Sequence, residues 1–71
     1  MTLADAEFGK TYKVTEIDTD DDEFKGFLSS LGCFVGSEIT VVSIISKSYV
    51  VSIRDSRYNI DEDVAQAIKI G

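Results

Sequence analysis

The sequence predicts a mainly β domain in which five short strands close into a small, partly open barrel, with one short α-helix and one helical turn. Three observations favour this fold. β-Branched residues are concentrated in short runs, only one long segment has helical spacing, and Gly32 and Gly36 enclose an apolar loop that joins the helix to the next strand. A chain of 71 residues forms one domain, here residues 1–71.

The N-terminal part is predicted to be a short lead-in followed by a strand. In the lead-in, residues 2–9, Leu3 and Phe8 are the expected core anchors and Gly9 a turn. Residues 11–17 alternate in the manner of a strand, and the alternation shifts by one residue before Ile17. Such a shift predicts a β-bulge or a strand end.

An acidic run, residues 18–23, leads directly into the predicted helix. Asp20 and Glu23 have the spacing of a capping box. Behind them, apolar residues follow at the i, i+3, i+4 and i+7 positions of one helical face: Phe24, Phe27, Leu28 and Leu31. We expect this face to plug one end of the barrel, and Gly32 to end the helix in a left-handed conformation.

The remainder of the chain reads as a hairpin, a short strand, a helical turn and a closing strand. The predicted elements are strands at 38–45 and 49–54 around the turn Ser46-Lys47-Ser48, a strand at 57–60, a helical segment at 61–67, and a final strand containing Ile68 and Ile70. The acidic residues at the start of the helical segment suit the positive end of a helix dipole.

The charge balance argues against nucleic acid as a partner. The chain has 13 acidic and 7 basic residues, a net charge of −6, whereas phosphate backbones are bound by clustered Lys and Arg. The same sign disfavours adsorption to anionic lipid. No apolar run approaches the length of a membrane span and no signal peptide is visible, so we expect no membrane insertion and a cytoplasmic location.

The residue types present offer no catalytic constellation. The chain has no His and one Cys, which excludes a His-based general base, a catalytic triad, an internal disulfide and a thiolate zinc site. No phosphate-binding glycine loop is present. Cys33 lies among apolar neighbours and is predicted to be a buried structural thiol. We therefore expect no enzymatic activity and no cofactor.

The acidic run is the one candidate for a metal site. Asp18, Asp20 and Asp22 occupy the first, third and fifth positions of an EF-hand loop, but the required glycine is replaced by Glu23 and the bidentate glutamate by Ser29. A solvated, helix-capping loop is the favoured reading, and no tight metal binding is expected. Weak attraction of divalent cations by these carboxylates is the alternative.

A partner-binding surface is the remaining possibility. Phe34 and Val35, in the loop after Gly32, either plug the barrel or form an exposed patch that docks a partner. Tyr12, Tyr49 and Tyr58 are expected in the core or at its rim, and the alternative is an aromatic groove of the kind that binds proline-rich peptides. The predicted partner-binding residues are Cys33, Phe34, Val35 and Tyr49.

Over essentially its full length the chain resembles the FeoA family of small proteins that accompany the ferrous-iron transporter FeoB. The corresponding residues are Leu3, Gly9, Val14, Ile17, Leu28, Leu31-Gly32, Gly36, Ile39, the hairpin 41–53 and the tail Ala65-Gln66-Ala67-Ile68-Lys69-Ile70. The Leu-Gly-x-x-x-Gly turn is the most specific of these. Val35 stands where the family usually has proline and Phe27 where it often has arginine.

The resemblance implies an SH3-like barrel, no enzymatic activity, and a role in ferrous iron uptake through binding or regulating the cytoplasmic region of a FeoB-like transporter. Two alternatives from other classes remain open. One is a stand-alone SH3-like module that binds peptides, and the other is a regulator that responds to divalent metal through the acidic run.

Overall fold

The chain forms five strands, two α-helices and one short 3-10 helix in the computed structural model, which describes residues 1–71. In chain order the elements are η1 (Leu3–Asp5), β1 (Thr11–Ile17), α1 (Asp22–Ser30), β2 (Glu38–Ile45), β3 (Ser48–Ile53), β4 (Ser56–Asp61), α2 (Glu62–Ala67) and β5 (Ile68–Ile70). The predicted order is confirmed. β3 and β4 each begin one residue earlier than predicted, and Arg54 belongs to the turn that joins them.

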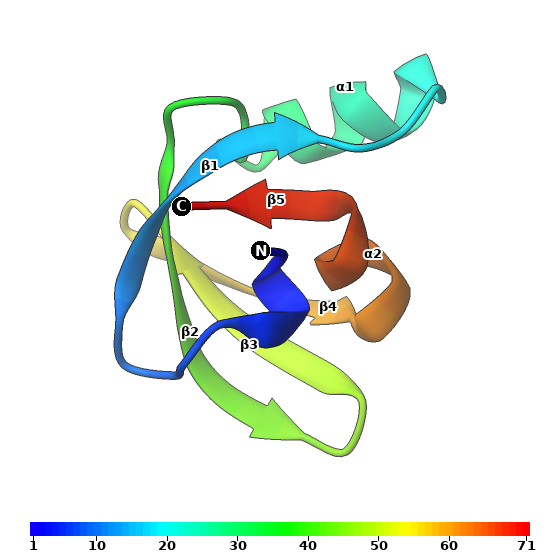
Figure 1. Cartoon of the computed structure of the whole chain (residues 1–71). Helices are drawn as coiled ribbons and strands as arrows, with labels where there is room; N and C mark the ends of the chain where they lie inside the picture. Colours follow the sequence, from blue (N-terminus) through cyan, green and yellow to red (C-terminus); the bar gives the residue numbers. More distant parts are fainter.

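The strands make one antiparallel sheet in the order β4-β3-β2-β1-β5, which curls into a barrel (Figure 1). The edge strands β4 and β5 are not paired with each other. The short helix α2 connects them and packs on β3, β4, β5 and η1. The predicted partly open barrel is therefore confirmed, and α2 spans the opening.

β1 belongs to both sides of the barrel because its two halves pair with different strands. Residues 11–13 pair with β2, and residues 14–17 pair with β5. The register shifts between Val14 and Glu16, which confirms the bulge predicted from the slipped alternation. Since a bulge increases strand twist, it lets one strand turn from one side of the barrel to the other. A second shift, between Val41 and Ser43, lies in the pairing of β2 with β3.

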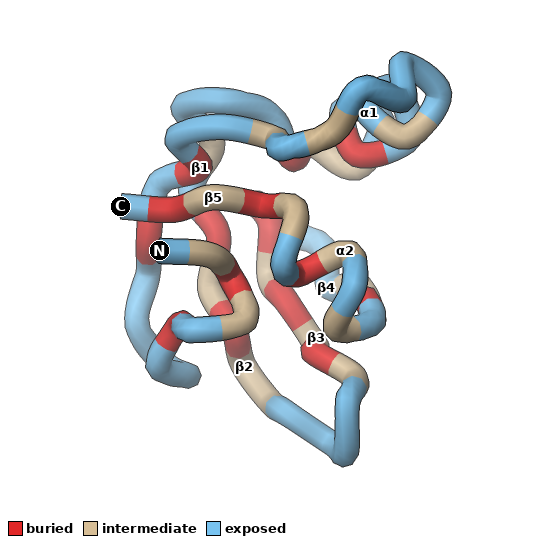
Figure 2. The backbone as a smooth tube through the Cα atoms, turned by 45° about the vertical axis from the view of Figure 1, so that its right-hand side comes forward, coloured by how far each residue is buried: buried red, intermediate tan, exposed pale blue.

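The buried positions, red in Figure 2, are all occupied by hydrophobic residues. The largest fully buried side chains are Leu3, Val14, Leu28, Cys33, Ile39, Val41, Val51 and Ile68. β3 shows the expected alternation, with every second side chain buried. Burial of a large aliphatic side chain stabilises the folded state by roughly 1.5–3 kcal/mol, so this cluster is the main source of stability.

The cap of α1 lies one residue later than predicted. The side chain of Asp21, not Asp20, accepts hydrogen bonds from the backbone N–H groups of Glu23 at 2.9 Å and Phe24 at 3.3 Å. The N–H of Asp21 in turn donates to the hydroxyl of Thr19 at 3.1 Å. The capping role of the acidic run is confirmed, but its residue assignment was wrong.

The predicted apolar face of α1 is only partly correct. Leu28 is fully buried and Phe24 packs against the core, but Phe27 is 54% exposed. One residue along a helix is a rotation of about 100°, so Phe27 lies on the flank of the stripe centred on Leu28 and Phe24. Phe8 is also exposed, because it lies in the turn before β1, ahead of the first inward-pointing residue of that strand, Tyr12. Neither Phe27 nor Phe8 is the core residue that the pattern predicted.

Alanine substitutions at two glycines test this account of α1 and its end, because they are expected to change the free energy of unfolding in opposite directions. Gly32 has φ +88°, and a Cβ there would approach Cγ2 of Ile53 to 3.3 Å. Gly32→Ala should therefore lower the free energy of unfolding by about 1–2 kcal/mol. Gly26 lies inside α1 with nothing near its Cβ position, so Gly26→Ala should raise this free energy by up to about 1 kcal/mol. Urea denaturation measures both, and two shifts of the same sign would contradict this account.

Candidate functional site

The loop after α1, residues 32–37, begins with a Schellman turn. The N–H of Cys33 donates to the carbonyl of Leu28 at 2.9 Å, and the N–H of Gly32 donates to the carbonyl of Ser29 at 3.0 Å. Gly32 is left-handed, as predicted. Leu28 and Cys33 are both buried, which supplies the hydrophobic contact typical of this motif. We call residues 32–37 the Phe34 loop.

The second half of the Phe34 loop is a tight turn attached to β1. The N–H of Ser37 donates to the carbonyl of Phe34 at 2.9 Å, and Gly36 has φ +96°. Gly36 and Ser37 each make a backbone hydrogen bond of 2.8 Å with Val14. The Ser37 hydroxyl donates to the carbonyl of Gly32 at 2.7 Å and accepts from the N–H of Phe34 at 3.3 Å. Hydrogen bonds therefore fix both halves of the loop.

This loop presents two apolar side chains to solvent. Phe34 is 41% exposed and Val35 is 62% exposed, so the docking-patch alternative for these residues agrees with the geometry better than the barrel-plug alternative. Val35 stands at the second position of the turn and Gly36 at the third, where a positive φ is typical of a type II turn. That turn type commonly has proline where this chain has Val35.

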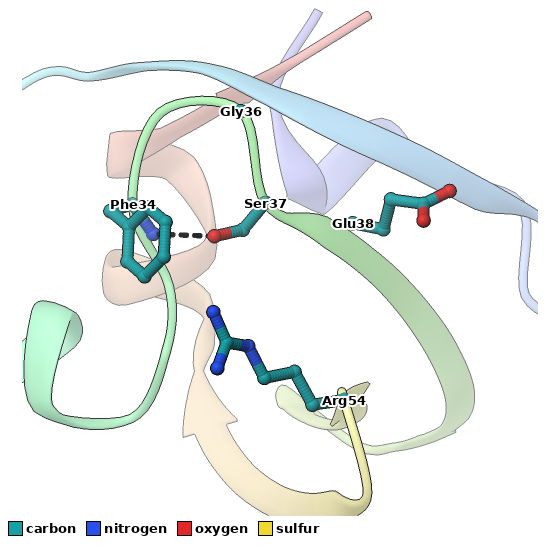
Figure 3. A pocket seen from close by; sticks show the side chains of 5 residues that line it. All are labelled: Phe34, Gly36, Ser37, Glu38 and Arg54. Carbon is teal, nitrogen blue, oxygen red and sulfur yellow. Dashed lines mark hydrogen bonds between the residues drawn. The ribbon is translucent and has the colours of Figure 1, made fainter.

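Two open hollows flank Phe34. The first, of about 290 Å³, is lined by Phe34, Gly36, Ser37, Glu38 and Arg54 (Figure 3). The second, of about 360 Å³, lies between β1 and α1 and is lined by Glu16, Ile17, Lys25, Ser29, Cys33, Phe34 and Val35. Phe34 is the wall common to both, so a ligand that contacts this ring can enter either hollow.

Arg54 is a site residue that the sequence pattern did not indicate. Its guanidinium lies 5.7 Å from the centroid of the Phe34 ring, within the range of a cation–π interaction. Arg54 occupies the turn between β3 and β4 with φ +57°. In Figure 3 the guanidinium points towards Phe34 and Ser37, whereas the carboxylate of Glu38 points away from it. The contact joins residues twenty positions apart, so no local motif could reveal it.

Cys33 lies beneath the loop and is 2% exposed, which confirms the predicted buried thiol. Burial raises the pKa of this thiol to about 11. At neutral pH the group is therefore a neutral thiol, and its thiolate, the form that attacks electrophiles or binds metal, is scarce. Cys33 forms the floor of the second hollow and is not part of its exposed rim.

Tyr49 lies apart from the Phe34 loop and does not extend its surface. The side chain is 7% exposed, and its hydroxyl is 3.5 Å from the carbonyl oxygen of Ala4 in the N-terminal segment. Tyr49 is near the start of β3, whereas Arg54 follows the end of that strand. The core alternative for this tyrosine therefore agrees with its position, and the structure does not place Tyr49 beside Phe34 and Val35.

The acidic run is not folded into a cation site. Asp18, Asp20 and Asp22 precede or begin α1, and Asp21 between them is engaged as the helix cap. No three carboxylate, thiol or imidazole groups in the chain are arranged to hold a metal ion.

Neither helix has the length and apolar character needed to cross a bilayer.

Comparison with known proteins places the chain among small SH3-like domains. The FeoA domain profile matches residues 1–70, and among curated proteins none matches the sequence. A manganese-dependent transcriptional repressor shares the fold with TM-score 0.87 and 22% identity, over 99% of this chain but 40% of the repressor. An iron uptake regulatory protein (FeoA) has TM-score 0.85 and 20% identity, over 99% of this chain and 92% of that one. Stenotrophomonas maltophilia FeoA, an SH3 domain protein complexed with zinc, has TM-score 0.86 and 18% identity. The match covers 100% of this chain and 89% of that one.

The raised pKa of Cys33 predicts a pH dependence of stability. The unfolded chain loses its thiol proton near the ordinary pKa of 9.0, whereas the folded chain retains it up to about 11. The stabilisation that comes from the buried neutral thiol is therefore complete below pH 9 and is lost as the pH rises towards 11. Urea denaturation from pH 7 to 11 should show a steeper loss for the wild type than for Cys33→Ala. Parallel curves would contradict this origin of the dependence.

Proposed function

The chain belongs to the FeoA domain family, and from this membership we propose that it is an accessory protein of ferrous iron uptake that binds the cytoplasmic region of a FeoB-type transporter. Proteins of this family are non-enzymatic accessory proteins. A regulatory binding role of this kind requires a contact surface and no reactive centre. The proposed location is the cytoplasm, where such a region of the transporter would be met.

The observation that carries the proposal is the exposed pair Phe34 and Val35 on a loop fixed by hydrogen bonds. Interface energy is typically concentrated in a few side chains, with aromatic residues over-represented, that fill or border pockets near the centre of the contact. Phe34 is such a residue, because its side chain lines both hollows. Burial of the exposed parts of these two side chains would supply a favourable hydrophobic contribution.

The preformed loop supports binding in a second way. Side chains and loops that become ordered on association cost free energy, roughly 0.5–1.5 kcal/mol for each immobilised flexible side chain. The Phe34 loop is already held at Gly32 and Val14, and the phenylalanine ring has few rotatable bonds. Little of the hydrophobic gain is therefore lost in ordering this surface.

Charged substitutions in the Phe34 loop test the proposed contact. Phe34→Asp and Val35→Asp should each weaken binding to the soluble cytoplasmic region of the cognate transporter by tenfold or more, since about 1.4 kcal/mol of lost interaction corresponds to tenfold. Isothermal calorimetry measures the affinity, and thermal denaturation checks that each variant remains folded.

Ile45→Asp is the matched control. Ile45 is 65% exposed, close to the 62% of Val35, but lies at the far end of β2, next to the β2–β3 turn. This variant should bind like the wild type. Equal affinities of the wild type and folded Phe34→Asp and Val35→Asp would remove the Phe34 loop from the contact.

The proposal also predicts that iron is handled by the transporter and not held by this chain. Because no ligand cluster is arranged around Asp18, Asp20 and Asp22, calorimetric titration with Fe(II), Mn(II) or Ca(II) should give no micromolar site. The matched variant Asp18→Asn/Asp20→Asn/Asp22→Asn should give the same result. A micromolar site that this triple variant loses would instead favour the metal-responsive regulator.

A further inference from the structure

Two basic side chains lie next to Phe34 in this acidic protein. The chain has a net charge of −6, and the lining of each hollow contains one basic and one acidic residue, Arg54 with Glu38 in the first and Lys25 with Glu16 in the second. The one ion pair in the structure joins Lys69 to Glu16 at 3.8 Å, so neither cation has an acidic partner within the chain. Two of the seven basic residues thus flank the proposed contact without being neutralised.

Arg54 is held in position to receive a carboxylate. The guanidinium lies 5.7 Å from the centroid of the Phe34 ring, and Figure 3 shows it pointing towards Phe34 and Ser37, which line the first hollow. An arginine guanidinium has a planar array of N–H donors that fits a carboxylate bidentately, and stacking on an aromatic ring leaves those in-plane donors free. Because the carboxylate of Glu38 points away, this group does not occupy the donors.

The second hollow is suited to an apolar side chain. Ile17, Cys33 and Val35 contribute apolar lining, together with Phe34. Its volume of about 360 Å³ is at the small end of the range of ligand sites, which is enough for one large side chain. Lys25, from α1, and Glu16 provide charged groups at this hollow, and Glu16 already pairs with Lys69.

We propose that the occupant of this surface is an acidic segment of the partner that carries a large apolar side chain between carboxylates. The apolar side chain enters the second hollow, one carboxylate binds Arg54 across the Phe34 ring, and another lies near Lys25. This proposal rests on the proposed function and specifies which part of the transporter's cytoplasmic region is recognised. Charge complementarity selects this occupant over a basic or neutral segment.

A second copy of the chain is a weaker candidate for the same surface. Two chains of net charge −6 repel each other at moderate ionic strength. A second copy brings this whole charge to the contact, whereas a short segment of a partner brings only its own carboxylates. The preferred occupant is therefore a segment of a different protein.

Neutralising the two cations tests the proposal. Calorimetry should compare the wild type with Arg54→Gln, Lys25→Gln and the control Lys47→Gln, using the soluble cytoplasmic region of the cognate transporter as the probe. Lys47 is the matched control because it lies beside Asp61, Glu62 and Asp63, in a hollow away from the Phe34 loop. We expect a loss of about tenfold for Arg54→Gln, a smaller loss for Lys25→Gln, and none for Lys47→Gln. Added salt should weaken the wild type more than Arg54→Gln.

The outcomes separate this inference from the function on which it rests. One outcome would be that the wild type binds, that Phe34→Asp abolishes binding, and that Arg54→Gln and Lys25→Gln bind like Lys47→Gln. In that case the inference of an acidic segment is wrong and the proposed function stands. If the wild type does not bind the cytoplasmic region, both proposals fall.

Peptides provide an independent arm of the test. Synthetic peptides from the acidic stretches of that cytoplasmic region should bind the wild type, and the same peptides with Asn and Gln in place of Asp and Glu should bind at least tenfold more weakly. Equal binding of the amide versions would overturn the inference. So would a stable dimer in sedimentation that Arg54→Gln dissociates, because the occupant would then be a second copy.

Discussion

The position of Phe34 depends on the turn at Gly32, where α1 ends against the barrel. The hydrogen bond from Cys33 to Leu28 and the contact between their buried side chains join the last turn of the helix to the core. Cys33 is buried by this contact, and the next residue, Phe34, is exposed. A left-handed residue at position 32 is what allows this reversal, and the methyl group of Ile53 leaves little room for a side chain there.

The same turn explains how a domain with a small core can support an exposed aromatic side chain. An apolar residue on a free loop tends to collapse onto the nearest hydrophobic surface, which removes it from a partner. Here the backbone bonds of Gly36 and Ser37 to Val14 hold the loop on β1, and the Ser37 hydroxyl bridges its two halves. Arg54 covers part of the ring without enclosing it. Rigidity of the backbone therefore takes the place of a larger scaffold.

The predictable features are those with local signals. The strands, the bulge in β1, the burial of Leu3 and Cys33 and the left-handed Gly32 all follow from alternation, helical spacing or turn chemistry over a few residues. The wrong predictions of burial arose where the spacing of apolar residues is compatible with either a buried or an exposed side chain. Phe27 is on the flank of the helical stripe, and Phe8 precedes the strand that would have turned it inwards.

The candidate site needed three-dimensional contacts, because its parts come from separate elements. Lys25 is on α1, Phe34 is in the loop, and Arg54 is in the β3–β4 turn. In the sequence Arg54 appears only as one of two neighbouring arginines, and Tyr49 appears equally suited to a surface. The register of β3 determines the positions of Tyr49 and Arg54. It places Tyr49 in the core, and Arg54 follows in the turn after the strand.

The charge pattern suggests a division of roles between attraction and selection. The overall charge of −6 slows the approach of any acidic molecule, and this long-range effect weakens with salt. In the proposed arrangement Arg54 would act at short range, through a guanidinium that lies 5.7 Å from the centroid of the Phe34 ring. An acidic segment in another orientation therefore meets repulsion without the compensating contact. In the proposed arrangement the apolar ring would contribute hydrophobic binding energy, and the cations beside it would favour an acidic segment over a neutral or basic one.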